Sequence, residues 1–229
     1  MIKVFKQKIR KILFSKTIAK ILLRPLLKLH NQIYSLIGKY ACSINDGIHP
    51  KREILEYEKW FLDNISEEHR VVDVGCNSGY MALKMSNKAQ HVFGIDMSES
   101  LIKKAKQTTK NNVDFVCADV NNYDFSSFGA IDVLTMSNVL EHIENRVDFL
   151  KKILSSSSWG KERKILIRVP MIDRDWLSVY KKNIGIDYRL DPTHFTEYTL
   201  SDFQKEIKDA NLELESYKIR FGEIYAICK

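Results

Sequence analysis

Two glycines and two acids in the segment 71–96 have the types and spacing needed to bind a nucleotide-like ligand. Gly75 and Gly79 lie in a short turn between an apolar run and a helix-competent run, and glycines let the backbone approach a ligand where a Cβ would collide. Asp73 ends the first apolar run, at the edge where open α/β sheets bind ligands. Asp96 ends the second run, where an acid can accept hydrogen bonds from both ribose hydroxyls. The sequence therefore predicts a ribose-containing ligand at this loop.

The glycine spacing fits a dinucleotide-binding fingerprint poorly. That pattern, GxGxxG, requires glycine at positions 75, 77 and 80, where the chain has Gly75, Asn77 and Tyr80. The pattern D-x-G-x-x-x-G fits instead, at Asp73, Gly75 and Gly79. Asn77 tolerates a positive φ better than most residues, so we expect the loop to close.

Four motifs between residues 71 and 145 together resemble the class I S-adenosylmethionine-dependent methyltransferases. They are VVDVGCNSGYMAL at 71–83, Gly-Ile-Asp-Met-Ser around Asp96, Cys-Ala-Asp-Val around Asp119 and Ser-Asn-Val-Leu-Glu-His at 137–142. They occur in the order and spacing of that family. The resemblance implies S-adenosylmethionine as the cofactor. It also implies a Rossmann-like, doubly wound, mostly parallel seven-stranded sheet that closes with an antiparallel C-terminal hairpin.

The resemblance assigns a role to each motif residue. The residues implied to bind the cofactor lie at strand ends and in the loops that follow: Asp73, Gly75, Cys76, Asn77, Gly79, Asp96, Met97, Asp119, Val120, Asn138 and Leu140. The first five surround the methionine moiety, Asp96 holds the ribose and Met97 lies beside the adenine. Asp119 accepts from the adenine amino group, or else is only a turn residue at a strand end. Asn138 and Leu140 line the floor of the site.

Alternating strands and helices carry these loops. Short apolar runs predict strands at 71–75, 91–95, 113–117, 131–136 and 164–169, with helices at 79–87, 98–109, 146–154 and 199–210. This alternation favours a parallel sheet with right-handed crossovers. Two further alternating runs, 212–220 and 223–228, meet at Phe221-Gly222 and predict a hairpin. Residues 155–158 are expected to form a short loop.

The connection 171–198 is a candidate substrate lid, because long ordered loops at a ligand-binding edge are commonly functional. Its mixed aromatic, acidic and basic composition suits a polar acceptor such as a sugar. An alcohol must lose its proton during methyl transfer, and a histidine titrating near neutral pH suits this task. We nominate His194 as the general base, with Asp191 or Glu197 as its orienting partner. The alternative is that His194 only fastens the lid through a hydrogen bond.

The segment around His194 resembles the D-x-x-H-x-x-x-[FY]-[ST] stretch of many small-molecule and glycan methyltransferases. His142, after the fourth strand, is a second candidate: either a base near the methyl group or a structural residue packed over the sheet end. A divalent-metal mechanism would need convergent carboxylates, and the sequence assigns none. The motifs typical of nucleic-acid base methylation are absent, so nucleic acid is not expected as an acceptor.

Residues 1–42 are predicted to be a basic, amphipathic helical extension, followed by the methyltransferase domain at 43–229. Ten Lys or Arg and no acids occur in residues 1–45, whereas the remainder has 26 basic and 29 acidic side chains. Pro25 should kink or divide the extension. A helix lying on an anionic membrane surface would use this pattern. The alternative is packing on the domain or on another subunit in a homo-oligomer.

The scattered cysteines and the lack of a signal-peptide pattern favour a cytoplasmic protein, peripheral at the inner membrane face if the extension binds lipid. The function expected from this reasoning is O-methylation of a sugar or surface-glycan precursor. Two alternatives stay open. One is a quinone, lipid or natural-product methyltransferase, and the other is a non-catalytic S-adenosylmethionine-binding subunit that docks a membrane or partner.

Overall fold

The computed structural model describes residues 2–108 and 110–229. They divide into two compact units. One runs from the N-terminus to Ile54 and includes Trp176–Tyr188, and the other comprises Leu55–Asp175 and Arg189–Lys229. The sequence-predicted boundary lay near residue 42, with the lid at 171–198 assigned to the larger domain.

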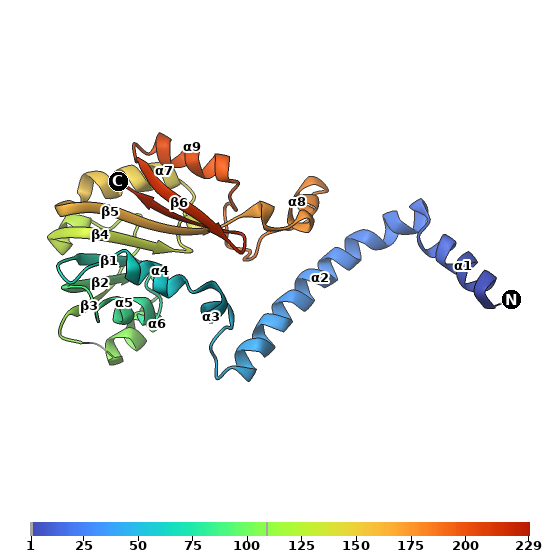
Figure 1. Cartoon of the computed structure of the whole chain (residues 1–229), viewed down its shortest axis with the longest axis horizontal. Helices are drawn as coiled ribbons and strands as arrows, with labels where there is room; N and C mark the ends of the chain where they lie inside the picture. The colour runs from blue at the N-terminus through green and yellow to red at the C-terminus, as the bar shows by residue number, and fades with distance from the viewer. Residues whose placement is uncertain (1, 109) are drawn as a thin grey trace. The chain divides into compact units, whose positions relative to one another are not determined.

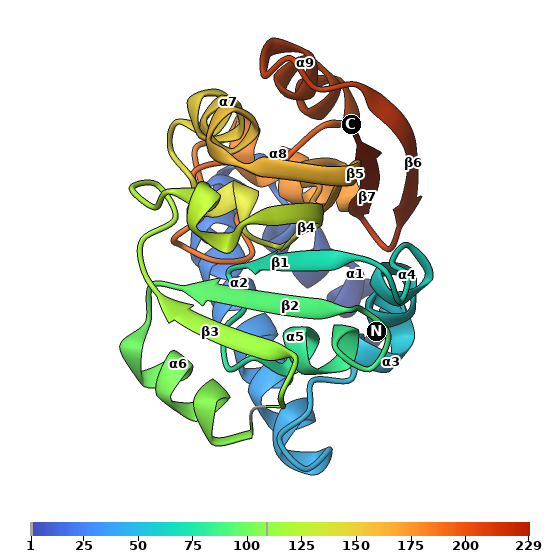
Figure 2. The same ribbon diagram turned by 90° about the vertical axis from the view of Figure 1, so that its left-hand side faces the viewer.

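The larger unit is built on a seven-stranded sheet in the order β3-β2-β1-β4-β5-β7-β6 (Figure 2). Its strands are β1 (Arg70–Val74), β2 (His91–Asp96), β3 (Val113–Cys117), β4 (Ala130–Ser137), β5 (Ser158–Pro170), β6 (Leu214–Arg220) and β7 (Glu223–Cys228). Strands β1 to β5 pair in parallel, and β7 runs antiparallel to both β5 and β6. The predicted Rossmann-like, mostly parallel sheet with an antiparallel C-terminal hairpin is therefore confirmed.

Helices cover both faces of this sheet. They are α4 (Tyr57–Asp63), α5 (Tyr80–Met85), α6 (Glu99–Ala105), α7 (Arg146–Ser156) and α9 (Leu200–Asp209). Successive strand residues point to opposite faces. Val72 thus joins the apolar core formed with α7 and α9, whereas Val71 joins the core formed with α4, α5 and α6. Both cores are made of buried side chains, which is why the strands read as nearly continuous apolar runs.

The strand order reverses between β1 and β4, and this reversal positions the candidate site. After β1 the chain builds outward through β2 and β3, then returns to the other side of β1. Val74 at the end of β1 pairs with Ile95 on one side and with Met136 on the other. The loops that follow β1, β2 and β4 therefore begin level with one another, at the edge where such sheets bind ligands.

Strand β5 is longer than the predicted 164–169, because it begins at Ser158. The loop expected at 155–158 was wrong: α7 extends to Ser156 and β5 follows after one residue. The added part is polar, so it lacked the apolar pattern of a strand. It is fixed by Asp132, whose Oδ1 accepts a hydrogen bond from the Lys161 amide at 3.0 Å.

Helix α6 is also shorter than predicted. It ends at Ala105, and a 3-10 turn, η1 (Lys106–Thr108), follows, while residue 109 lies outside the described residues. The C-terminal hairpin is confirmed. Phe221 and Gly222 both have positive φ, of 49° and 72°, as a two-residue hairpin turn requires.

The smaller unit contains α1 (Ile2–Leu13), α2 (Lys16–Ile44) and α8 (Trp176–Asn183), and α3 (Lys51–Leu55) begins at its end (Figure 1). Pro25 was expected to kink or divide the segment; helix α2 continues through it, so the proline does not divide the segment. The division falls at Ser15 instead. Its extended backbone ends α1, and its hydroxyl accepts a hydrogen bond from the Ile18 amide at 3.4 Å, which caps α2.

Helix α8, inside the predicted lid, packs on α2. Lys181 is buried and donates to Asn31 Oδ1, while Arg24 donates to the Ile184 carbonyl at 2.8 Å and Asn31 to the Asp187 carbonyl at 2.9 Å. The central part of the connection 171–198 is thus anchored to the N-terminal helix.

Candidate functional site

The loop after β1 adopts the tight conformation that its glycines predict. The φ angles of Gly75, Asn77 and Gly79 are 69°, 53° and 80°, so Asn77 takes the left-handed conformation expected of it. The amides of Gly75 and Cys76 both donate to the Ile95 carbonyl, at 2.8 and 3.0 Å. The loop is therefore fastened to the end of β2, with Cys76 buried beneath it and Asn77 exposed.

Two neighbours make these glycines obligatory. A Cβ on Gly75 would lie 2.5 Å from a Val139 methyl carbon, and one on Gly79 would lie 2.6 Å from the Phe115 ring. The packing thus excludes a side chain at both positions and leaves the loop backbone accessible to a ligand.

Asp96 joins two of the ligand-binding loops. Its Oδ2 accepts from the Asn77 amide and its Oδ1 from the Ser98 amide, each at 2.9 Å. The carboxylate is partly exposed at the end of β2. It can therefore hold the loops together and still accept hydrogen bonds from ligand hydroxyls.

Asp73 is a buried acid with one unused oxygen. Its side chain is 3% exposed, and Thr135 donates to Oδ1 at 2.8 Å. Among the described residues Oδ2 has no hydrogen-bond partner. Burial raises the pKa of this carboxyl to about 7, an effect that the Thr135 hydrogen bond partly offsets. A cationic group of a ligand would satisfy this oxygen and favour its charged form.

The residues expected around an adenine differ in exposure. Met97 is 76% exposed and Val120 is 9% exposed. Asp119 is exposed, and its carboxylate accepts three hydrogen bonds, from the amide and side chain of Asn121 and from the side chain of Asn122, at 2.9 to 3.0 Å. Asp119 thus makes the hydrogen bonds of a turn residue at a strand end, which was the alternative to adenine binding. Its carboxylate still has lone pairs that a ligand could use.

The floor residues after β4 have different environments. Asn138 has a φ of 57°, and its Oδ1 accepts from Arg168 Nε at 2.7 Å. Arg168 also lies 3.4 Å from the Glu223 carboxylate. Leu140 is fully buried in the apolar core, so its side chain supports the site from below.

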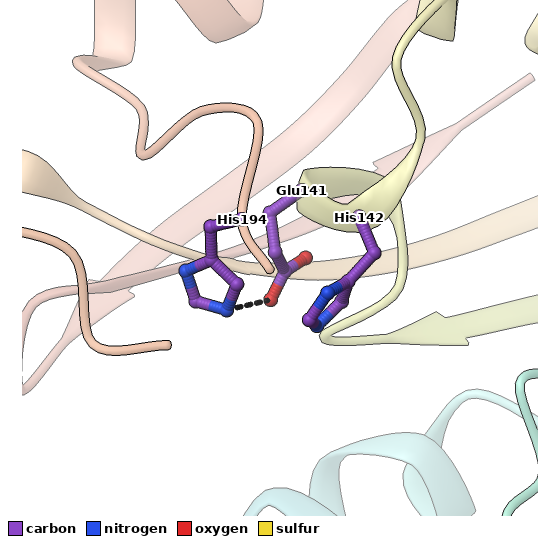
Figure 3. A group of neighbouring side chains, drawn as sticks. All are labelled: Glu141, His142 and His194. Atoms are coloured by element: carbon purple, nitrogen blue, oxygen red, sulfur yellow. Dashed lines mark ion pairs between the residues drawn. The ribbon is translucent and has the colours of Figure 1, made fainter. Parts of the chain in front are cut away.

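Glu141, His142 and His194 form a group at the same edge (Figure 3). The first two belong to the 3-10 turn η3 (Leu140–His142) after β4, and His194 comes from the connection after β5. One ligand atom of each lies within 4.8 Å of the other two. His194 Nε2 is 4.0 Å from Glu141 Oε1, and the two imidazole rings meet edge to face with centroids 4.7 Å apart.

A second layer of polar side chains orients both histidines. His194 Nδ1 lies 3.2 Å from Glu197 Oε1, and the buried Glu197 is itself paired with Arg174. Of the two partners left open for His194, Glu197 therefore makes the hydrogen bond. His142 Nδ1 lies 2.9 Å from the hydroxyl of Thr193.

Asp191 acts on His142 through Thr193. Its Oδ1 accepts from the Thr193 hydroxyl at 2.6 Å and from the Thr193 amide at 2.8 Å, and these hydrogen bonds lower the pKa of Asp191. Burial lowers the pKa of His142, and the nearby His194 lowers it further. Burial raises the pKa of Glu141 to about 7.

Sequence reasoning did not include Glu141 among the site residues. It is separated from His194 by more than 50 positions, and the two meet because β4 and β5 are parallel neighbours. The sequence feature that could have indicated this contact is that Glu141 follows β4 and His194 follows β5, its neighbour in the sheet.

The fold is a Rossmann-like α/β domain with a glycine loop and strand-end acids at its switch point. Residues 72–155 match the methyltransferase domain family. This match agrees with the resemblance of the motifs to the class I S-adenosylmethionine-dependent methyltransferases.

Curated relatives and solved structures agree with this placement. The chain is 32% identical to a probable (S)-tetrahydroprotoberberine N-methyltransferase 2 of Papaver bracteatum over 44% of the chain and 29% of that protein. It is 26% identical to the ubiquinone biosynthesis O-methyltransferase of Acinetobacter baylyi over 64% of each. The chain thus spans under two thirds of the length of these relatives. The DhpI–SAM–HEP complex has the same fold, with a TM-score of 0.62 at 14% identity, over 88% of this chain and 97% of that one.

The raised pKa of Asp73 predicts a pH-dependent stability. The ligand-free native state holds a proton that the unfolded chain, with a pKa near 3.8, has released, so stability falls as pH rises from about 4 to 7. Asp73→Asn keeps an acceptor for Thr135 and removes this titration. Between pH 5 and pH 8 we expect wild type to lose on the order of 2 kcal/mol relative to the variant. Urea unfolding at both pH values measures this, and an unchanged difference would contradict it.

Proposed function

We propose that this chain binds S-adenosylmethionine at the loop of residues 75–79 and transfers its methyl group to an acceptor hydroxyl. The observation that carries the proposal is the placement of Asp73 and Asp96 at the ends of adjacent strands, on either side of a bare glycine loop. Asp96 would accept from the ribose hydroxyls, and the unused oxygen of Asp73 would face the cationic methionine end. The match of residues 72–155 to the methyltransferase domain family and the ligand named in the DhpI complex support this cofactor.

Calorimetry tests the cofactor. We expect one S-adenosylmethionine per chain and no binding of NAD. Asp96→Asn should weaken S-adenosylmethionine binding by about 10- to 100-fold, because charge-assisted hydrogen bonds contribute about 1.5–3 kcal/mol. Asp114→Asn is the matched control, since Asp114 is an exposed strand acid that pairs with His91 away from the loop. Tight NAD binding without S-adenosylmethionine binding would refute the proposal.

The acceptor oxygen would lose its proton at the Glu141–His142–His194 group. Methyl transfer is an in-line displacement in which the sulfonium C–S bond breaks as the O–C bond forms, leaving neutral S-adenosylhomocysteine. The hydroxyl proton must therefore leave. Glu197 only accepts hydrogen bonds when ionised, so neutral His194 donates from Nδ1 and keeps its lone pair on Nε2. His194 Nε2 is thus our candidate base, with Glu197 holding its ring.

We propose a sugar or surface-glycan precursor as the acceptor. The polar, aromatic and charged composition of the connection 171–198 supports this choice, since a sugar needs both hydrogen-bonding groups and flat apolar surfaces. A quinone, lipid or natural product is the second candidate, favoured by the relatives named as ubiquinone biosynthesis O-methyltransferases. A non-catalytic S-adenosylmethionine-binding subunit is the third.

Methyl transfer to sugar-nucleotide, lipid-linked sugar and quinol acceptors separates these candidates. We expect a sugar acceptor to be methylated and His194→Ala to reduce kcat at least 100-fold while S-adenosylmethionine still binds. His91→Ala is the matched control, because His91 pairs with Asp114 on the sheet away from the group. Unchanged turnover in His194→Ala would remove His194 as the base. Cofactor binding without transfer to any acceptor would favour the non-catalytic candidate.

We also propose that α1 and α2 lie on an anionic membrane surface on the cytoplasmic side. No helix in the described part of the chain is long and apolar enough to cross a membrane. Large apolar side chains spaced at i, i+4 and i+7 are nevertheless exposed along α2: Leu22, Leu26, Leu29, Ile33, Leu36 and Tyr40. The opposite face carries the buried Leu27 and Asn31, whose side chain is hydrogen-bonded to Lys181 of α8 and to the Asp187 carbonyl. The ten basic residues of this segment would attract anionic lipid, and the four free cysteines fit a reducing compartment.

Liposome sedimentation of the full chain tests this surface. Ile33→Asp places a charge on the apolar face and should reduce pelleting with anionic vesicles. Ser35→Asp adds the same charge at an exposed position outside that face and should reduce it less. Equal pelleting of the two variants, equal pelleting with neutral vesicles, or a stable dimer that ignores vesicles would refute the proposal.

A further inference from the structure

We propose that Glu141, His142 and His194 bind a divalent transition-metal ion of the Zn²⁺, Mn²⁺ or Fe²⁺ type. Two imidazoles and one carboxylate form a donor set that such ions take up. The three side chains already converge, with one ligand atom of each within 4.8 Å of the others (Figure 3). The site does not depend on the proposed methyl transfer, although its role toward an acceptor does.

The hydrogen bonds behind the two rings leave the same nitrogen free on each. His194 gives its Nδ1 proton to Glu197, which leaves the lone pair on Nε2. The Thr193 hydroxyl donates its one proton to Asp191, so it can only accept a hydrogen bond from His142 Nδ1. Neutral His142 therefore also keeps its lone pair on Nε2. Metal-binding histidines are typically fixed in this way by a partner on the other ring nitrogen.

Glu141 provides an independent observation. It is fully buried, yet neither carboxylate oxygen has a hydrogen-bond partner among the described residues. In that part of the chain its charged contact within 4.0 Å is the ion pair with His194, at the limit of that distance. A buried carboxylate without donors is costly and uncommon in folded proteins. A cation between Glu141 and the two rings would supply the missing charge.

The site is held in shape, and one of its three side chains reaches the surface. The Phe195 amide donates to the Glu141 carbonyl at 2.8 Å, which fastens the segment carrying His194 to the turn carrying Glu141 and His142. Glu141 and His194 are buried, whereas His142 is partly exposed. Three protein ligands with one accessible side are typical of catalytic metal sites, where a further position takes water or substrate.

Bound to an acceptor hydroxyl, such an ion would lower the pKa of that hydroxyl and favour its deprotonation. The proton would leave to solvent, and the alkoxide oxygen would attack the methyl carbon. The ion would occupy the Nε2 lone pair of His194, so His194 cannot be ligand and base at once. Metal dependence of turnover therefore decides between the two roles.

Titration of the chelator-treated full chain with Zn²⁺ and with Mn²⁺ tests the site directly. We expect one ion per chain by calorimetry, and Co²⁺ substitution should give a visible absorption band. Glu141→Gln and His142→Gln should each weaken binding at least 10-fold. Thr193→Val, which removes the hydroxyl between His142 and Asp191, should weaken it by about 10-fold or more. His91→Ala should leave it unchanged. Circular dichroism of each variant separates lost ligands from lost folding.

Absence of stoichiometric binding, or binding that survives in folded Glu141→Gln and His142→Gln, would overturn the metal site. S-adenosylmethionine affinity measured on the same samples reports separately on the proposed function. Retained cofactor binding without metal binding would refute the metal site alone. Metal binding without methyl transfer would refute the proposed reaction alone. Turnover that persists after complete chelation would overturn the role of the ion toward the acceptor and leave His194 as the base.

Discussion

Parallel pairing of β1 with both β2 and β4 is the constraint on which the rest of the structure depends. Because Val74 pairs with Ile95 and with Met136, the three strands end at the same level. The candidate ligand contacts at this edge of the sheet all follow from that alignment. Asp96 can reach the Asn77 amide only because the turn after β1 begins beside the end of β2. The reversal of strand order beside β1 keeps the edge clear of a crossover helix.

The glycine loop after β1 packs against the segment that leads into the polar group after β4. Val139 occupies the space where a Gly75 side chain would lie, and it directly precedes the η3 turn that carries Glu141 and His142. Asn138 holds the start of this turn in a left-handed conformation and receives a hydrogen bond from Arg168 on β5. The glycine loop therefore packs against the residue that leads into the turn of Glu141 and His142.

The sequence predicted most of the sheet because its strands are buried on both faces, so burial and apolar pattern coincide. It failed at the start of β5, where residues 158–163 are mostly polar and are held by hydrogen bonds to Asp132, a residue remote in the chain. It also failed to locate the break between α1 and α2, because Ser15 acts through its capping hydroxyl and Pro25 is accommodated within α2. The contact of Glu141 with His194 is set by strand adjacency, which residue spacing along the chain does not encode.

The connection after β5 serves both units of the chain. Its middle, Trp176–Tyr188, is tied to α2 by the buried Lys181, and its last part carries Thr193, His194 and Glu197. Only residues 189–193 separate the end of this middle part from His194. The Phe195 amide donates to the Glu141 carbonyl, which fastens the last part of the connection to the turn after β4. The polar group is thus formed by segments that follow β4 and β5, both within the larger unit.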